Sequence, residues 1–488
     1  MHRPARLPAR LLDLRHRPRR TDLRRAVRGD RIPRQAPVRR PPVRRPLGGR
    51  PGDAPDALVA RAHLFGLYLL LGLTVSTWLA RLPTVRESLH LSTGELGTVL
   101  LVGSLGSLTM VLGAGALATR WGSRRSMVVA AWTYSVAAVL LGVGPEVGSV
   151  VVLGAGVVAM SVSFALGNVP LNVQSVAIER RMGRTVVPQF HAGFSIGSVL
   201  GSGLGALAAW GRVPLVVQFS AVAVVALVWR LRSIPGAVLP MAPQETRAVV
   251  TPGGSMREAL RAWRDPRTLV LGVLVMAGGL SEGTANNWLA IGVVDGFRAR
   301  EAVGALVFAT FVASMTAARV SGTRLIDRFG RAPVMLASTS TALAGLVGFA
   351  LSPTLPVAVL GAVAWGLGAG LVVPIGMAAV TGDGVGAAGR VAVASAFAST
   401  ANLIAPPAIG LAAEAAGVRH AVLLVGGVMI VGVLLSRRVA DDRASAVAPS
   451  GAPAAVPALE AVDLPVLEAV DLPAAAVTPA VRPEVAAP

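Results

Sequence analysis

Twelve stretches of mostly apolar residues, each long enough to cross a lipid bilayer, run through residues 58–436. A membrane-spanning helix needs roughly 20 such residues. Inside hydrocarbon every backbone polar group must be satisfied within its own segment, so a helix is the structure that each stretch allows. The sequence therefore predicts an all-α membrane protein with twelve transmembrane helices. The expected spans lie near 61–82, 93–118, 126–144, 148–177, 189–211, 214–231, 268–294, 302–322, 333–352, 355–380, 390–414 and 419–436.

The composition agrees with an integral membrane protein. Hydrophobic residues make up 53% of the 488 residues and charged residues 15%, whereas about 25% of a soluble domain is charged. The chain has no cysteine, which excludes disulfides, zinc–thiolate sites and thiol catalysis. We expect no cofactor, no metal site and no catalytic residue, so a membrane-embedded enzyme is disfavoured.

Most of the net charge of +21 lies near the N-terminus, where the first 50 residues hold 17 arginines and three aspartates. We expect this Arg/Pro-rich extension, residues 1–57, and the Ala/Pro/Val tail at 437–488 to be disordered. Two interpretations of the extension remain open. It is either an arm attracted to anionic headgroups or RNA, or the product of a start codon placed too far upstream. The membrane body carries no nucleic-acid signal.

Arginines in the connecting segments orient the bundle. With the N-terminus inside, cytoplasmic connections at 120–125, 180–184, 230–267, 319–331 and 390 hold eighteen arginines, and the outer connections hold six. The positive-inside rule then predicts that both termini are cytoplasmic, in the cytoplasmic membrane. The polar linker at 232–267 separates a bundle of six spans at 58–231 from a second at 268–436.

Short similarities between the two sets of six spans indicate a duplicated unit. They follow one another in the same order and at nearly constant spacing, which predicts two six-helix bundles related by a pseudo-twofold axis. Such repeats are usual in secondary transporters, with the substrate site between them. The matching pairs are TVSTWLA at 74–80 with TANNWLA at 284–290, GALATRWGSRR at 115–125 with TRLIDRFGRAP at 323–333, and Pro170 with Pro374.

The two loops just named resemble the signature loop of the major facilitator superfamily, G-x-L-x-(D)-R-x-G-x-R-R. The runs NVPLNVQSVAIERRMGR (168–184), FHAGFSIG (190–197), WLARLP (78–83) and EGTANNW (282–288) resemble its YbjJ-type branch, related to sugar-permease-like facilitators. The resemblance covers about residues 58–436 and implies a transporter that works by alternating access.

The same resemblance implies that the loops lock an inner gate. Thr119 stands where the family has an aspartate, and Thr323 replaces a glycine, so the first copy departs from the pattern. Alternatively, the loops are positive-inside anchors. The residues that carry the gating role are Arg120, Gly122, Arg124 and Arg125 in one half and Asp327, Arg328, Gly330 and Arg331 in the other.

Glu282 is the first candidate for coupling. A charge at the centre of a membrane helix costs roughly 2.5–3.5 kcal/mol on insertion scales, so Glu282 must face water, find a cation or stay protonated. Desolvation favours the protonated carboxyl, which suits proton exchange. Asn286 lies one turn further on the same face, and Asn287 is its neighbour. The alternative is a neutral glutamate hydrogen-bonded between helices.

Two further polar stripes are candidates for substrate contact. In the fourth span Ser161, Asn168, Asn172 and Ser175 share a helical face, and amides suit hydroxyl-rich or zwitterionic solutes. The alternative is hydrogen bonding between helices. The second stripe lies in the fifth span, and its candidate is His191, near the cytoplasmic end. This histidine either titrates in the physiological range or bonds a loop carbonyl.

The remaining candidates have structural alternatives of their own. The small residues Gly193, Gly197, Gly201 and Gly205 predict a close packing seam. Trp78 and Trp288 either wall an outward-facing vestibule or belong to an interfacial belt. Arg81 either binds an anionic substrate or reaches the headgroups, and Asn402 is a weaker candidate of the same kind.

These features predict a secondary active transporter that moves a small polar, sugar-like solute, with a proton gradient as the driving force. The chain has no G-x-x-x-x-G-K-[ST] nucleotide motif, which favours a gradient over ATP. Efflux of amphiphilic compounds and a non-transporting sensor of the same fold are the alternatives. The expected partners are the solute, H⁺ and the lipid bilayer, and the expected state is a monomer.

Overall fold

The computed structural model describes residues 54–183, 186–241, 260–381 and 387–446. Most of the two predicted terminal extensions and the middle of the predicted linker lie outside these residues. The first described helix begins at Ala54 and the last one ends at Ala446. Helical structure therefore extends into both predicted extensions, 1–57 and 437–488.

All regular structure in the described residues is helical. The first half contains α1 (Ala54–Leu79), α2 (Leu82–Ser88), α3 (Thr93–Glu146), α4 (Val150–Met182), α5 (Val187–Trp210) and α6 (Leu215–Ala237). The second half contains α9 (Pro266–Phe297), α10 (Glu301–Phe329), α11 (Arg331–Leu351), α12 (Leu355–Thr381), α13 (Ala387–Ala416), α14 (Val418–Ala421) and α15 (Leu423–Ala446).

The helices of the described residues account for all twelve predicted spans. Eleven segments are long and apolar enough to cross a membrane. The twelfth is the first part of α3, which Gly122, with non-helical dihedral angles, divides into the second and third spans. The start of α3 is fixed by a capping box. Ser92 Oγ accepts the Glu95 N–H at 3.1 Å, and the Glu95 carboxylate accepts the Ser92 N–H at 2.8 Å.

The two loops that match in sequence also match in backbone conformation. Gly122 has φ 80° and ψ 160°, and Gly330, between α10 and α11, has φ 83° and ψ 161°. This region is essentially accessible to glycine alone. Each half therefore makes the same turn between its second and third spans, as a duplicated unit would.

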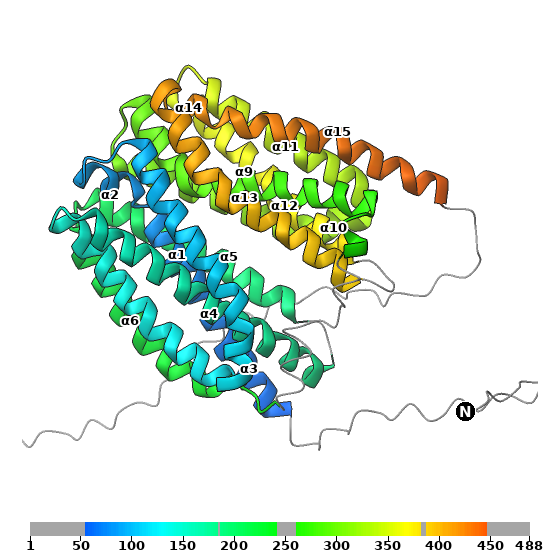
Figure 1. The fold of residues 1–488 in the computed structure, drawn as a ribbon, viewed down its shortest axis with the longest axis horizontal. Coiled ribbons are helices and arrows are strands. Elements are labelled where there is room, and N and C mark those ends of the chain that lie inside the picture. Colours follow the sequence, from blue (N-terminus) through cyan, green and yellow to red (C-terminus); the bar gives the residue numbers. More distant parts are fainter. Residues whose placement is uncertain (1–53, 184–185, 242–259, 382–386, 447–488) are drawn as a thin grey trace, which may run out of the picture.

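Helix packing repeats between the halves. In each half the first span packs against the fifth, as α1 on α5 and as α9 on α13. Across the interface α3 packs against α13, and α10 packs against α5. Exchanging the halves converts one contact into the other, which is the relation that a twofold axis imposes. Figure 1 shows the two bundles side by side, with α2 and α14 at the same end.

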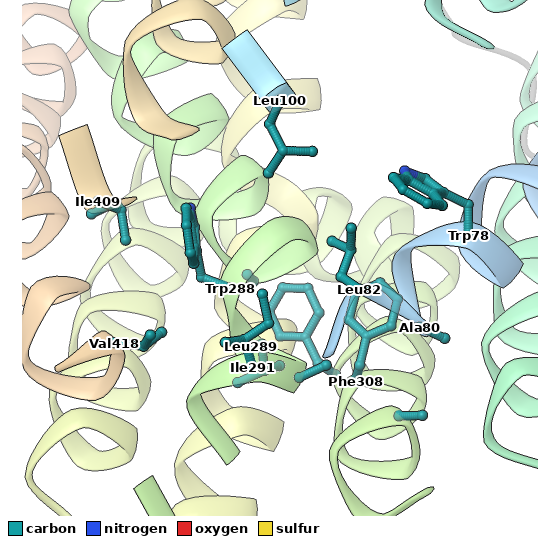
Figure 2. Packing of buried hydrophobic residues seen from close by; sticks show 14 of the residues in the cluster. Trp78, Ala80, Leu82, Leu100, Trp288, Leu289, Ile291, Phe308, Ile409 and Val418 are labelled. Atoms are coloured by element: carbon teal, nitrogen blue, oxygen red, sulfur yellow. The ribbon is translucent and has the colours of Figure 1, made fainter. Parts of the chain in front are cut away.

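One apolar cluster joins the two bundles at the end that carries α2 and α14, which is the outer end in the predicted orientation. Figure 2 shows side chains of both halves in this cluster. Its members include Trp78, Leu82 and Leu100 from the first half and Trp288, Phe308 and Ile409 from the second. Apolar packing therefore closes the outer end of the interface.

Candidate functional site

A cavity of about 320 Å³ lies between the two halves, with walls from α1, α3, α4, α9 and α13. Gly103, on its wall, lies ten residues into α3. At 1.5 Å per residue this is about 15 Å from the helix start, near the middle of a bilayer core roughly 30 Å thick. The polar lining residues are Ser104, Ser107, Ser161, Asn287, Ser399 and Asn402, and the aromatic ones are Trp78 and Phe164. None of the described lining residues is charged.

Asn287 and Ser104 show how the polar lining is held. The Asn287 amide N–H donates to the Gly283 carbonyl one turn earlier, at 3.0 Å, which orients the side chain and leaves its oxygen as an acceptor. The Ser104 hydroxyl lies 3.1 Å from the Leu100 carbonyl and 3.2 Å from the Asn402 carbonyl. It therefore ties α3 to α13 beside the cavity.

Glu282 is ion-paired with Arg319 of α10. One guanidinium nitrogen lies 3.1 Å and 3.0 Å from the two carboxylate oxygens. The Arg319 Nε–H also donates to the Gly370 carbonyl of α12 at 3.3 Å. The side chains of Arg319 and Glu282 are 26% and 25% exposed, so the pair is only partly buried.

Sequence analysis missed this pair because it assigned Arg319 to the cytoplasmic connection at 319–331. The structure corrects that assignment, since Arg319 lies within α10, ten residues before its end at Phe329. The signal was a single arginine at the end of the apolar run FVASMTAARV. Asn286, expected on the same wall as Glu282, does not line the cavity, whereas Asn287 does.

The predicted stripe of the fourth span divides into two parts. Ser161 lines the cavity, while Asn168, Asn172 and Ser175 form a hydrogen-bonded network with Tyr68 of α1. The Tyr68 hydroxyl donates to the Asn172 side chain at 3.0 Å and lies 3.1 Å from Ser175 Oγ. The Asn172 amide N–H lies 2.9 Å from the Asn168 carbonyl and 3.2 Å from its side-chain oxygen. Sequence analysis missed Tyr68, although the chain has only two tyrosines.

His191 is exposed and packs edge-on against Tyr68, with ring centroids 5.6 Å apart. The histidine therefore lies beside the Tyr68 network of the first half.

The two tryptophans have different environments. Trp78 lines the cavity and packs against Phe219, with ring centroids 6.0 Å apart. Trp288 is fully buried in the apolar cluster, at 0% exposure. It is therefore not part of an interfacial belt in this structure, and its role in the wall of an outward-facing vestibule stays a prediction.

Arg81 forms part of a polar contact between the halves at the outer end. Its side chain is 2% exposed and lies 2.8 Å from the Glu301 carboxylate of α10. It also donates to Gln218, to Thr84 and to the Val213 carbonyl. With its side chain buried, Arg81 does not reach the headgroups, and its role as a ligand of an anionic substrate stays a prediction.

Two more polar contacts close the same end. Arg86 of α2 pairs with Asp295 near the end of α9. The Gly94 N–H at the start of α3 donates to Glu414 of α13 at 3.1 Å. Sequence analysis did not find these contacts, because each joins residues more than 200 positions apart.

At the opposite end the eight predicted gating residues are all exposed. Within the described residues Asp327 makes no ion pair and Arg328 stacks on its neighbour Phe329, 5.2 Å from the ring centroid. The four glycines of the predicted packing seam, Gly193, Gly197, Gly201 and Gly205 of α5, face α1. A Cβ atom on Gly197 or Gly201 would collide with the backbone carbonyls of Leu69 and Leu73.

Comparison with known proteins identifies the protein family. The family model described as Major Facilitator Superfamily matches residues 64–391 and again 271–476. The uncharacterized transporter y4wD of Sinorhizobium fredii is 30% identical over 360 residues, which cover 74% of this chain and 92% of that protein. The membrane protein MosC of Rhizobium meliloti is 26% identical over 396 residues, covering 80% and 92%.

Solved structures show the same fold. A variant of the nucleoside transporter NupG superposes with a TM-score of 0.65 at 14% identity, covering 78% of this chain and 99% of that one. The E. coli fucose:proton symporter FucP gives a TM-score of 0.55 at 14% identity, with the same coverage. At this identity the likeness concerns the fold alone, and it confirms the predicted twelve-helix architecture of two bundles.

Proposed function

Since the chain belongs to the major facilitator superfamily, and is therefore a multi-pass membrane transporter, we propose that it carries a small polar solute through the cavity between its halves, by alternating access driven by protons. We place it in the cytoplasmic membrane with both termini inside, following its arginine distribution. One observation carries the proposal. The Glu282–Arg319 ion pair joins α10 to α9, the helix that also contributes Asn287 to the cavity.

The lining favours a small uncharged solute. Hydroxyls and amides around the cavity both donate and accept hydrogen bonds, and Trp78 offers an apolar face for a ring. A volume of about 320 Å³ is at the small end of ligand pockets, which run from roughly 300 to 1,000 Å³. The names of the structural neighbours, a nucleoside transporter and a fucose:proton symporter, support a sugar-like solute, as does the sequence resemblance to sugar-permease-like facilitators.

Proton coupling follows from the geometry of the pair. A proton on Glu282 removes the negative charge that holds Arg319, so the contact between α9 and α10 weakens. Asn287 lies five residues beyond Glu282 on the same helix, and a shift of α9 moves it in the cavity. Proton binding and solute binding thus act on one helix, which gives the two ligands a shared conformational equilibrium.

Alternating access requires that the outer contacts open. In the present structure Arg81, Arg86 and Gly94 hold α10, α9 and α13 at the outer end. We assign this arrangement to the outward-closed state. Opening towards the outside breaks these contacts and brings the gating loops of the two halves together at the inner end.

Export in exchange for protons would use the same geometry, and the apolar part of the lining, with Trp78, Phe164 and Met160, also suits an amphiphilic compound. Direction of net movement separates the two functions. Accumulation of a polar solute inside vesicles with an inward proton gradient supports uptake, and expulsion of an amphiphile supports efflux.

The test begins with thermal stabilisation of the purified full-length protein by sugars, polyols, nucleosides, amino acids and common antibiotics. The stabilising compound is then followed in proteoliposomes with an imposed proton gradient. We expect Glu282→Gln to abolish accumulation against a gradient while solute exchange at equilibrium continues. Glu146→Gln, at the exposed end of α3, removes a similar charge and serves as the matched control.

Two results contradict the proposal. If Glu282→Gln still concentrates the solute as the wild type does, Glu282 is not the coupling group. If a stabilising compound is never moved across the membrane by the wild type, a receptor role for the fold replaces transport.

A further inference from the structure

Arg230 is a buried positive charge in the first half, away from the transport cavity. Sequence analysis assigned it to the cytoplasmic connection at 230–267, but it lies within α6, seven residues before the helix ends at Ala237. Its side chain is 9% exposed. The guanidinium lies over the Tyr134 ring, 4.4 Å from the centroid, and one nitrogen donates to Thr74 Oγ1 at 3.2 Å.

No opposite charge accompanies Arg230 among the described residues. The acidic residues between positions 58 and 231 are Glu87, Glu95, Glu146 and Glu179. All four lie close to helix ends, and none forms an ion pair with Arg230 within the described part of the chain. The ring face of Tyr134 and the hydroxyl of Thr74 stabilise a guanidinium only partly. A buried charge without a counter-charge is strongly destabilising.

A cavity of about 40 Å³ lies directly against Arg230. Its other walls come from α1, α3, α4 and α6 and are mostly aliphatic, apart from Ser163. The Ser163 hydroxyl already donates to the Ala130 carbonyl at 2.8 Å. At about 40 Å³ this cavity is much smaller than the cavity of about 320 Å³ between the halves, which favours a small ion over an organic acid.

We propose that this cavity binds a small inorganic monovalent anion, of the size of chloride, which neutralises Arg230 inside the first bundle. The site shares no lining residue with the cavity between the halves. The anion is therefore a structural ligand of the bundle and is separate from the transported solute. Because Arg230 bridges α6 to Thr74 of α1 and Tyr134 of α3, its neutralisation stabilises the packing of these three helices.

The experiment measures the thermal unfolding midpoint of the purified full-length protein in chloride, bromide or gluconate at constant ionic strength. A ligand that binds only the folded state raises this midpoint saturably. We expect chloride and bromide to raise it over gluconate by about 1 °C for each ~1 kcal/mol of ligand contribution, the shift that an unfolding entropy of about 2.1 cal/mol/K per residue gives in a chain of this length. We expect Arg230→Gln to abolish the difference. Arg232→Gln, an exposed arginine on the same helix, removes the same charge outside the cavity and should keep it.

A second variant retains Arg230 and fills the space beside it. A Cβ atom on Gly167, which lines the cavity, would meet Ala130 Cβ at 3.4 Å, an ordinary contact. Gly167→Ala is therefore expected to fold and to weaken the halide response. This variant decides the question if Arg230→Gln does not fold, and bromide bound near Arg230 would appear in crystals by its anomalous scattering. Equal midpoints in chloride and gluconate, or an equal halide response in Arg230→Gln and Arg232→Gln, would overturn the proposal.

Discussion

Asp265 caps the helix that carries Glu282 and Asn287. Its carboxylate accepts the backbone N–H groups of Arg267 and Thr268, at 3.3 Å and 3.2 Å, and the Thr268 hydroxyl at 2.5 Å. These bonds favour the ionised form, with the Thr268 hydroxyl as the main cause, and they lower the pKa of Asp265 below its ordinary value of 3.8. A depressed pKa in the folded state means that the cap contributes stability above that ordinary value, and that the contribution is lost as the pH falls below it.

We predict that Asp265→Ala lowers the free energy of unfolding at neutral pH by about 1 kcal/mol, and by no more because the carboxylate is partly exposed to screening solvent. The difference between wild type and variant should shrink as the pH falls below about 3.8. Asp265→Asn keeps a capping oxygen without a titrating group. The difference in free energy of unfolding between Asp265→Asn and Asp265→Ala should therefore not depend on pH. Unfolding midpoints in detergent between pH 3 and 7 measure all three, and a pH-independent wild-type cap would contradict the prediction.

At the scale of the helix, α5 shows that a glycine matters through what it touches. Gly197 and Gly201 pack against carbonyls of α1, while Gly203 on the same helix has open space around its Cα. Close approach of two backbones needs small residues in a membrane bundle, where dispersion contacts and not the hydrophobic effect drive helix association. The seam thus holds α1, with its cavity residue Trp78, against the helix that contacts the other half.

We predict that Gly197→Ala destabilises the protein by about 1–3 kcal/mol, because the added methyl forces α1 away from α5. Gly203→Ala, the matched control, should be neutral or stabilising by up to ~1 kcal/mol, as alanine is the better helix former. Thermal unfolding of the two variants in one detergent makes the comparison. Equal effects of the two substitutions would mean that α1 and α5 do not approach as closely as described.

For the whole molecule, the arrangement of the halves defines the functional state. The contacts that close the outer end pair residues of different bundles, such as Arg86 with Asp295 and Arg81 with Glu301. A transporter that alternates must break them in each cycle. The apolar cluster beneath them contains Leu82 and Phe308, so opening also exposes apolar surface to water. In the proposed mechanism, solute and proton binding offset this free-energy cost.

We predict that locking this end stops transport. The natural chain has no cysteine, so Arg86→Cys combined with Asp295→Cys places the only two thiols in the protein on either side of the interface. A short bifunctional thiol reagent should link them and abolish solute movement in proteoliposomes, and a reducible linker should allow recovery. The two single-cysteine proteins treated alike are the controls. Undiminished transport by the linked protein would show that the halves do not separate here.

The local sequence determined the elements. Whether about 20 residues can lie in hydrocarbon depends on their own side chains, so the twelve spans were readable from hydrophobicity, as was the capping box at Ser92. The duplication was readable too, because the two halves keep matching sequence motifs. One pair of motifs contains Gly122 and Gly330, and a turn with their backbone conformation requires glycine in both halves, since other residues rarely adopt it. The major facilitator family, expected from the loop motifs, is confirmed by the family match.

Tertiary structure decided which polar groups meet. Glu282 finds Arg319 37 positions away, Tyr68 finds Asn172 104 away, and Arg81 finds Glu301 220 away. The arginine count that set the orientation assigned Arg319 and Arg230 to connections, although both fall among the last residues of the predicted spans at 302–322 and 214–231. Their burial depends on a partner from another helix, and the rotation and approach of packed helices, not any local pattern, determine where that partner lies.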